Sequence, residues 1–231
     1  MLRYVISSRI LWVLLAALLI DAKTAQADDA YYMIIFGQQD GADRPDASHT
    51  FATFVKATGE GADKSKYTLA SHTISWMPAS LHVKLLRRPE EGVNLDLKDT
   101  LRHAKAVKCQ VCMWGAFHIK KELYERALQQ VARLKKGDID YKALDLRFRP
   151  DSATNCIHAV CDIDMDKGLL ETGTACGNDA SYMVLKHLSR WIIDYDGTHD
   201  WIGQRLDLGK DIVRREYSPK AADDLKKPTA K

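Results

Sequence analysis

The feature that most limits the fold of this chain is its single long apolar run, the eleven residues Ile10–Ile20. A helix needs about 20 apolar residues to cross the hydrocarbon core of a bilayer, so this run is too short for a membrane span. Arg3 and Arg9 precede the run, and an A-x-A cleavage pattern follows it and ends at Ala27. This order is typical of a secretory signal peptide. We therefore predict a signal peptide over residues 1–27 and an exported protein, periplasmic or secreted, whose mature chain has no transmembrane segment.

The remaining 204 residues have the composition of a globular protein. The chain of 231 residues is 46% hydrophobic, which is enough to form a core and excludes a disordered chain. Its net charge is +3, of which the predicted signal peptide carries +2. The mature chain therefore offers no electrostatic basis for binding nucleic acid. We predict a single domain over residues 28–217 and a flexible, proline-containing tail over 218–231.

Hydrophobic patterns predict an α+β fold. Short apolar or β-branched runs predict strands at Tyr31–Phe36, His49–Ala57, Thr68–Met77, Lys108–Ile119 and Tyr141–Phe148. The polar stretch Thr58–Lys66 joins the second and third of these into a β-hairpin, and Arg87–Asn94 reads as a turn-rich loop. Amphipathic spacing predicts helices at Lys120–Lys136, Leu95–Val107, Thr154–Ile163, Ala180–Ile193 and within Trp201–Glu216. The order of strands, helix, strand and helices favours the α+β class.

The chain has an odd number of cysteines, which are Cys109, Cys112, Cys156, Cys161 and Cys176. An odd number in an exported protein leaves at least one thiol without a partner in its own chain. Cys161 and Cys176 could form a disulfide, which the sequence does not decide. The Cys109-x-x-Cys112 pair lies on a predicted strand, where residues three apart face opposite sides, and it lacks a second ligand pair. We interpret this pair as packed strand cysteines and predict no metal site and no cofactor.

Cys156 is the best candidate for a reactive residue, because it stands at the start of a predicted helix. Unsatisfied N–H groups and the positive end of the helix dipole favour a thiolate there and lower its pKa. A nucleophilic cysteine also needs a base and a group that orients the base. His158 points about 200° around the helix from Cys156, so the base must come from elsewhere. His49 opens a predicted strand and is the best candidate, and His72 lies on the next strand.

The segment Asn155–Val160, NCIHAV, resembles the NCEHFV-type motif of the lecithin:retinol acyltransferase-like family. HTFATFV at His49 and LASHTISWMP around His72 resemble the two histidine strands of that family, in the same order. The family belongs to the circularly permuted papain-like (NlpC-type) superfamily. The resemblance covers about half of the chain and implies a permuted papain-like fold, with Cys156 as nucleophile, His49 as base and His72 as the orienting residue. Ile157 and Ala159 depart from the motif, which puts a lipid acyl substrate in doubt.

These observations predict an exported cysteine hydrolase or acyltransferase. The Cys156 thiolate would attack an amide or ester carbonyl, His49 would move the proton, and the backbone N–H of Cys156 would stabilise the oxyanion. A cell-envelope peptide and a lipid acyl group are both open as substrates. Two alternatives are a non-catalytic binding module on the same fold and an unrelated fold in which the motif matches arise by chance.

Overall fold

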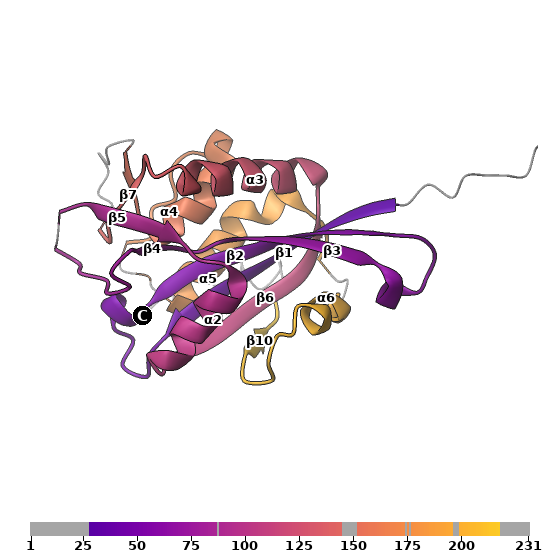
Figure 1. The fold of residues 1–231 in the computed structure, drawn as a ribbon, viewed down its shortest axis with the longest axis horizontal. Coiled ribbons are helices and arrows are strands. Elements are labelled where there is room, and N and C mark those ends of the chain that lie inside the picture. The colour runs from indigo at the N-terminus through magenta and orange to yellow at the C-terminus, as the bar shows by residue number, and fades with distance from the viewer. Residues whose placement is uncertain are drawn as a thin grey trace, which may run out of the picture.

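A computed structural model describes residues 28–217 except 87, 145–151, 174, 176 and 196–198. Its centre is a six-stranded sheet that consists mainly of long antiparallel strands (Figure 1). The strand order is β10 (Val213–Arg215), β6 (Gln110–Ile119), β1 (Asp28–Gln39), β2 (His49–Gly59) and β3 (Thr68–Ile74), and β9 (Ile192–Asp194) also pairs with β6. A smaller sheet has the order β4 (Trp76–Pro78), β5 (Glu90–Asn94), β7 (Asp140–Tyr141) and β8 (Ala153–Thr154).

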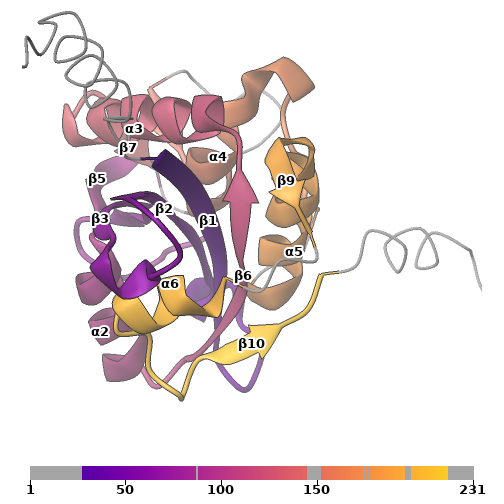
Figure 2. The same ribbon diagram turned by 90° about the vertical axis from the view of Figure 1, so that its right-hand side faces the viewer.

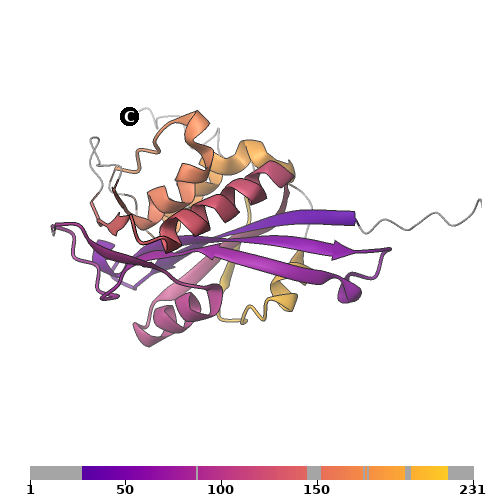
Figure 3. The same cartoon turned by 45° about the horizontal axis from the view of Figure 1, so that its top comes forward.

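Helices cover both faces of the central sheet, as Figure 3 shows from the side. One face carries α3 (Lys121–Lys135), α4 (Cys156–Cys161) and α5 (Gly177–Leu188), and the other carries α2 (Leu97–Ala106) and α6 (Asp200–Arg205). Figure 2 shows α5 running beside β6 and β1. Short 3-10 helices complete the described elements: η1 (Pro45–Ala47), η2 (Lys64–Lys66), η3 (Asp162–Lys167) and η4 (Ser189–Trp191).

The alternation of side chains along β2 divides the core into two layers. Ala52 and Phe54 pack into the cluster formed with α3, α4 and α5. Phe51 and Val55 point the other way, into the cluster formed with α2 and α6. Successive strand residues face opposite sides of a sheet, so the same rule fixes which layer each residue of β2 enters. The site described below lies at the end of β2 where these two layers meet.

The structure confirms the mixed α+β class with an antiparallel sheet and packed helices. It also confirms the β2–β3 hairpin, whose two strands pair antiparallel, and the helix predicted over Lys120–Lys136, which is α3. Cys156 is the first residue of α4, as expected for a cysteine at a helix start.

Two element predictions are wrong. The predicted loop Arg87–Asn94 contains β5, which packs so closely that a Cβ on Gly92 would lie 1.9 Å from the Trp76 ring. Of the strand predicted over Tyr141–Phe148, only Tyr141 belongs to one, since Lys142–Leu144 are irregular and the rest lies outside the described residues. The helix predicted within Trp201–Glu216 is present as the short α6, and β10 follows it.

Within the described part of the chain, no helix is both long and apolar enough to span a bilayer. The predicted signal peptide and its cleavage site, the predicted tail over 218–231 and Cys176 lie outside the described residues.

Candidate functional site

The β7–β8 ladder and the N-cap of α4 position Cys156. Tyr141 of β7 pairs in parallel with Thr154 of β8, and the chain then enters α4 directly. The Asn155 side chain caps the helix, because its Oδ1 accepts a hydrogen bond from the backbone N–H of His158 at 2.8 Å. Gln130 of α3 donates to the carbonyl oxygen of Ala159 at 2.9 Å, which fixes α4 against α3. The paired strand β8 before Cys156 and the capped helix α4 that begins with it therefore hold this residue in a defined place.

Cys156 lines a cavity of about 610 Å³, a volume typical of small-molecule sites. His49 also lines it, so two of the predicted site residues, Cys156 and His49, reach the same cavity. Tyr141 is a further lining residue that was not predicted from the sequence. Aliphatic side chains supply much of its wall, among them Val83, Leu85, Leu144, Ile157, Leu169 and Leu170. Glu171 is an exposed acidic residue of the lining. The cavity can accept a largely apolar group next to the thiol.

Burial raises the pKa of the Cys156 thiol above its ordinary value. The backbone N–H groups of Thr50, Cys156 and Ile157 lie against the sulfur and lower its pKa, but their effect is smaller than that of burial. The expectation that the helix start lowers this pKa is therefore wrong. α4 has only six residues, so its dipole is too small to compensate for the loss of water around a thiolate. The resting group is the neutral thiol.

His49 begins β2 and is almost completely buried. Its Nε2 lies 2.9 Å from Ser75 Oγ, and Ser75 Oγ lies 2.9 Å from Thr100 Oγ1 of α2. The other ring nitrogen, Nδ1, is buried and has no hydrogen-bond partner among the described residues. Burial, and then the nearby His103, lower the pKa of His49 to about 3. The imidazole is therefore neutral at physiological pH.

Cys156 and His49 are neighbours that approach β2 from different sides. The sulfur contacts the N–H of Thr50, the residue directly after His49, and α4, which carries Cys156, packs in the α3–α5 layer. The imidazole stacks on Phe51, at 5.4 Å between ring centroids, and hydrogen-bonds toward α2. In the described part of the chain, no hydrogen bond joins the two side chains. The structure brings the predicted nucleophile and base to one cavity but does not join them by a hydrogen bond.

The structure does not bring His72 to the site. His72 pairs with Phe54, which is five residues along β2 from His49, or about 17 Å at 3.4 Å per residue. Its ring packs near Tyr124 of α3, at 6.0 Å between ring centroids. The prediction that His72 orients His49 is therefore wrong. Residues on neighbouring strands lie side by side only if the register pairs them. The register of β2 and β3 keeps the two histidines apart.

Ser75 takes the position that we had predicted for His72. It is fully buried between β3 and β4, its backbone N–H donates to Asn94 Oδ1 at 2.9 Å, and its hydroxyl contacts His49. The sequence contained one indication of this role, namely a serine inside the apolar run ISWM. A serine at such a position is expected to be buried, and a buried hydroxyl needs a hydrogen-bond partner. Tyr141 was also missed as a site residue, since its aromatic ring fits equally well in a core.

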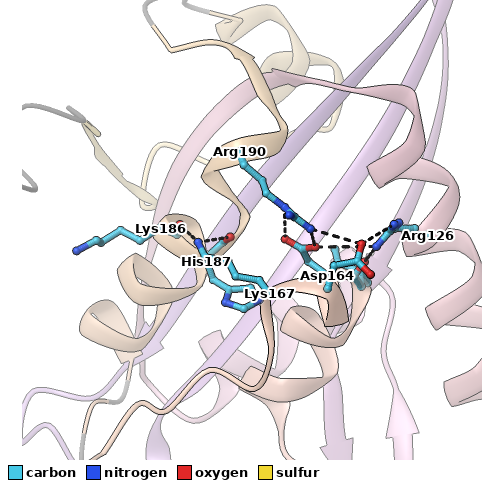
Figure 4. A network of polar contacts seen from close by, with 8 residues as sticks. Arg126, Asp164, Lys167, Lys186, His187 and Arg190 are labelled. Atoms are coloured by element: carbon cyan, nitrogen blue, oxygen red, sulfur yellow. Dashed lines mark hydrogen bonds and ion pairs between the residues drawn. The ribbon is translucent and has the colours of Figure 1, made fainter.

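An ion-pair network fixes the segment that follows α4 (Figure 4). The buried carboxylate of Asp164 in η3 receives two hydrogen bonds from Arg190, one of them at 2.9 Å from Nε, and Arg126 of α3 lies 3.9 Å away. Lys167 Nζ donates to the carbonyl oxygens of Lys186 and His187 at the end of α5. Burial raises the pKa of Asp164, but the neighbouring side chains, Arg190 foremost among them, together outweigh burial and hold that pKa below the usual value. The acidic residues of η3 thus fasten this segment to α3 and η4, and Lys167 fastens it to the end of α5.

The other described cysteines make separate contacts. Cys109 Sγ lies 3.4 Å from the carbonyl oxygen of Ala47, and Cys112 Sγ lies 3.9 Å from Ser181 Oγ. Neither is in a disulfide, in line with their interpretation as packed cysteines. Cys161 is buried in α4, and the suggested partner Cys176 is outside the described residues. No cluster of three or more potential metal ligands occurs in the part of the chain that the structure describes.

Comparison with known proteins gives no match: no family model, no curated protein and no solved structure is significantly similar to this chain. The resemblance of NCIHAV and the two histidine strands to the permuted papain-like superfamily therefore stays a prediction.

Proposed function

We propose that the protein is an exported cysteine hydrolase or acyltransferase with a permuted papain-like fold, in which Cys156 is the nucleophile and His49 the base. The observation that carries the proposal is the cavity shared by a thiol at a capped helix start and a histidine whose buried Nδ1 has no partner among the described residues. The order of the histidine strand and the cysteine helix along the chain agrees with that superfamily. Ser75 replaces His72 as the group that orients the imidazole.

In the proposed reaction, Cys156 Sγ attacks the carbonyl carbon of an amide or ester while its proton passes to His49 Nδ1. The C–N or C–O bond then breaks, and the leaving group takes the proton from Nδ1. Water or an acceptor hydroxyl or amine resolves the thioester. The resting pair is neutral, so the thiolate forms only during attack. Because Nδ1 is buried and is not bonded to the sulfur in the resting state, transfer follows a small turn of the His49 side chain toward Cys156.

The backbone N–H groups of Cys156 and Ile157 are the proposed donors to the oxyanion, since they already lie against the sulfur. The aliphatic wall of the cavity suits an apolar acyl group or side chain. The substrate is proposed to be a peptide or a lipid ester of the cell envelope, and the proposed reaction involves neither nucleic acid nor a cofactor.

One observation favours a second function, a binding module without catalysis. Burial keeps the thiol neutral and lowers the pKa of His49 to about 3, which removes the preformed ion pair that many cysteine enzymes use. In that case the cavity binds an apolar ligand and Cys156 only packs against it.

Intact-protein mass spectrometry after incubation with p-nitrophenyl acetate separates the two functions. The enzyme is expected to gain one acetyl group on Cys156. Cys156→Ala should gain none at that position, and His49→Gln should gain it far more slowly than the wild type. Cys112→Ser is the matched control, because it removes another buried thiol that lies outside the cavity. Absence of acetylation in the wild type, with a folded protein, would favour the binding module.

A further inference from the structure

The hydrogen bonds that hold His49 form a chain whose direction can be derived. Thr100 Oγ1 lies 2.9 Å from Ser75 Oγ and 2.7 Å from the carbonyl oxygen of Asp96. A threonine hydroxyl has one proton, so it can donate to only one of these atoms. A carbonyl oxygen can only accept, and two oxygens at 2.7 Å need a proton between them. The Thr100 proton therefore points to Asp96.

The remaining contacts then follow one after another. Because Thr100 has spent its proton, it accepts from Ser75, which in turn has no proton left for His49. At the 2.9 Å contact with Ser75, the proton must come from His49 Nε2. The opposite direction would leave the Thr100–Asp96 contact without a proton. Neutral His49 is thus protonated on Nε2, and Nδ1 carries a bare lone pair.

The burial of the chain makes this direction stable. Ser75 is 0% exposed, and Thr100 and His49 are each 1% exposed, so water does not compete for these hydroxyls. The carbonyl oxygen of Asp96 is itself fixed, because it also accepts the backbone N–H of Thr100 within α2 at 2.9 Å. Ser75 does not line the cavity that contains Cys156, so its hydroxyl orients the ring and does not meet the substrate.

We propose that Thr100 and Ser75 are positioning residues that fix the tautomer of His49, with a helix carbonyl at the far end setting Nδ1 as the basic atom. The use of Nδ1 toward Cys156 rests on the proposed function, whereas the direction of the hydrogen-bond chain does not. α2, on the opposite face of the sheet from α4, thereby controls the proton chemistry at Cys156. A wrong tautomer would present an N–H to the thiol instead of a proton acceptor.

The test is long-range ¹H–¹⁵N correlation NMR of histidine-labelled protein near pH 7, which distinguishes a bare from a protonated ring nitrogen. For wild-type His49 we expect a bare Nδ1 and a protonated Nε2. Thr100→Val removes the acceptor for the Ser75 proton, so Ser75 turns to donate to Nε2 and the tautomer shifts toward Nδ1–H. Thr100→Ser should restore the wild-type spectrum. Thr53→Val is the matched control, since Thr53 of β2 is also buried and bonds Thr73 at 2.9 Å without reaching His49.

The same variants report separately on the proposed function. Thr100→Val should slow acetylation of Cys156 by at least about tenfold, since a positioned general base contributes about 10²–10⁴-fold. A wild-type His49 protonated on Nδ1, or an unchanged tautomer in Thr100→Val, would overturn the positioning role. A tautomer that shifts as expected while Cys156 of the wild type never becomes acetylated would support the positioning role and overturn the proposed function.

Discussion

Tyr141 lies opposite Thr154 in the parallel β7–β8 ladder, and it lines the same cavity as Cys156, two residues after Thr154. Burial, and then the neighbouring Cys156, hold the pKa of Tyr141 well above its ordinary value, so the phenol keeps its proton at neutral pH. A protonated hydroxyl at the wall of the cavity can donate to negative charge that develops during attack by the thiol. We therefore expect Tyr141 to take part in the proposed reaction, a role that its sequence context did not indicate.

Tyr141→Phe should therefore slow the acetylation of Cys156. Loss of one donor to an oxyanion costs about 10²–10³-fold where the donor is fully aligned, and we expect a reduction of about 10- to 100-fold. The rate is followed by release of p-nitrophenolate in a stopped-flow experiment. Tyr182→Phe controls for the loss of a phenol elsewhere, since Tyr182 packs on Trp114 outside the cavity. An unchanged rate in Tyr141→Phe would limit this residue to packing.

The elements of the fold that could be predicted are those whose local pattern agrees with their burial. α3 has a regular apolar face, and β1 and β2 contain the apolar or β-branched runs Tyr31–Phe36 and Thr50–Val55. β5 could not be predicted, because EEGVN has no strand pattern and its pairing depends on contact between Gly92 and Trp76. The short β10 likewise exists only through its parallel pairing with β6.

The candidate site was predictable only in part, for a related reason. Cys156 and His49 were found because motif and helix-start chemistry are local properties of the sequence. The role of His72 could not be judged from the sequence, because the sequence of two paired strands does not show their register. The hairpin register pairs His72 with Phe54 and not with His49. The sign of the Cys156 pKa shift depends on burial by distant segments, which no local pattern reports.

The stability of the protein should decrease as the pH falls below about 6.5, in part because of His49. Its folded pKa of about 3 lies below the unfolded value of 6.5, so the unfolded chain binds a proton more readily in between. The contribution is complete above pH 6.5 and is lost as the pH falls toward 3. Urea unfolding at pH 7 and pH 5 measures it.

For His49→Gln, the loss of unfolding free energy between these two pH values should be smaller than in the wild type by about 2 kcal/mol. His82→Gln serves as the control, because it removes an exposed histidine whose ring bonds Ser80 and not the His49 site. An equal pH dependence in wild type and His49→Gln would show that His49 can take up a proton in the folded protein.

Asp164→Asn should lower the free energy of unfolding by about 2 kcal/mol. The buried carboxylate accepts two hydrogen bonds from Arg190, and bonds to charged groups contribute about 1.5–3 kcal/mol each. We expect the lower part of that range because Arg190 is 46% exposed and keeps much of its hydration. Asp166→Asn is the control, since its carboxylate is 59% exposed and should cost well under 1 kcal/mol. Equal losses in the two variants would show that burial of Asp164 does not strengthen the network.

The most direct test of the central claim is the pH dependence of Cys156 acetylation between pH 5 and pH 8, in the wild type and in His49→Gln. If His49 is the general base, neutral imidazole and neutral thiol react together, so the wild-type rate should be nearly constant above the His49 pKa of about 3. His49→Gln should react far more slowly at pH 5 and gain about tenfold per pH unit, because only free thiolate then reacts. Wild-type and His49→Gln rates that coincide and both rise tenfold per pH unit would contradict a base role for His49.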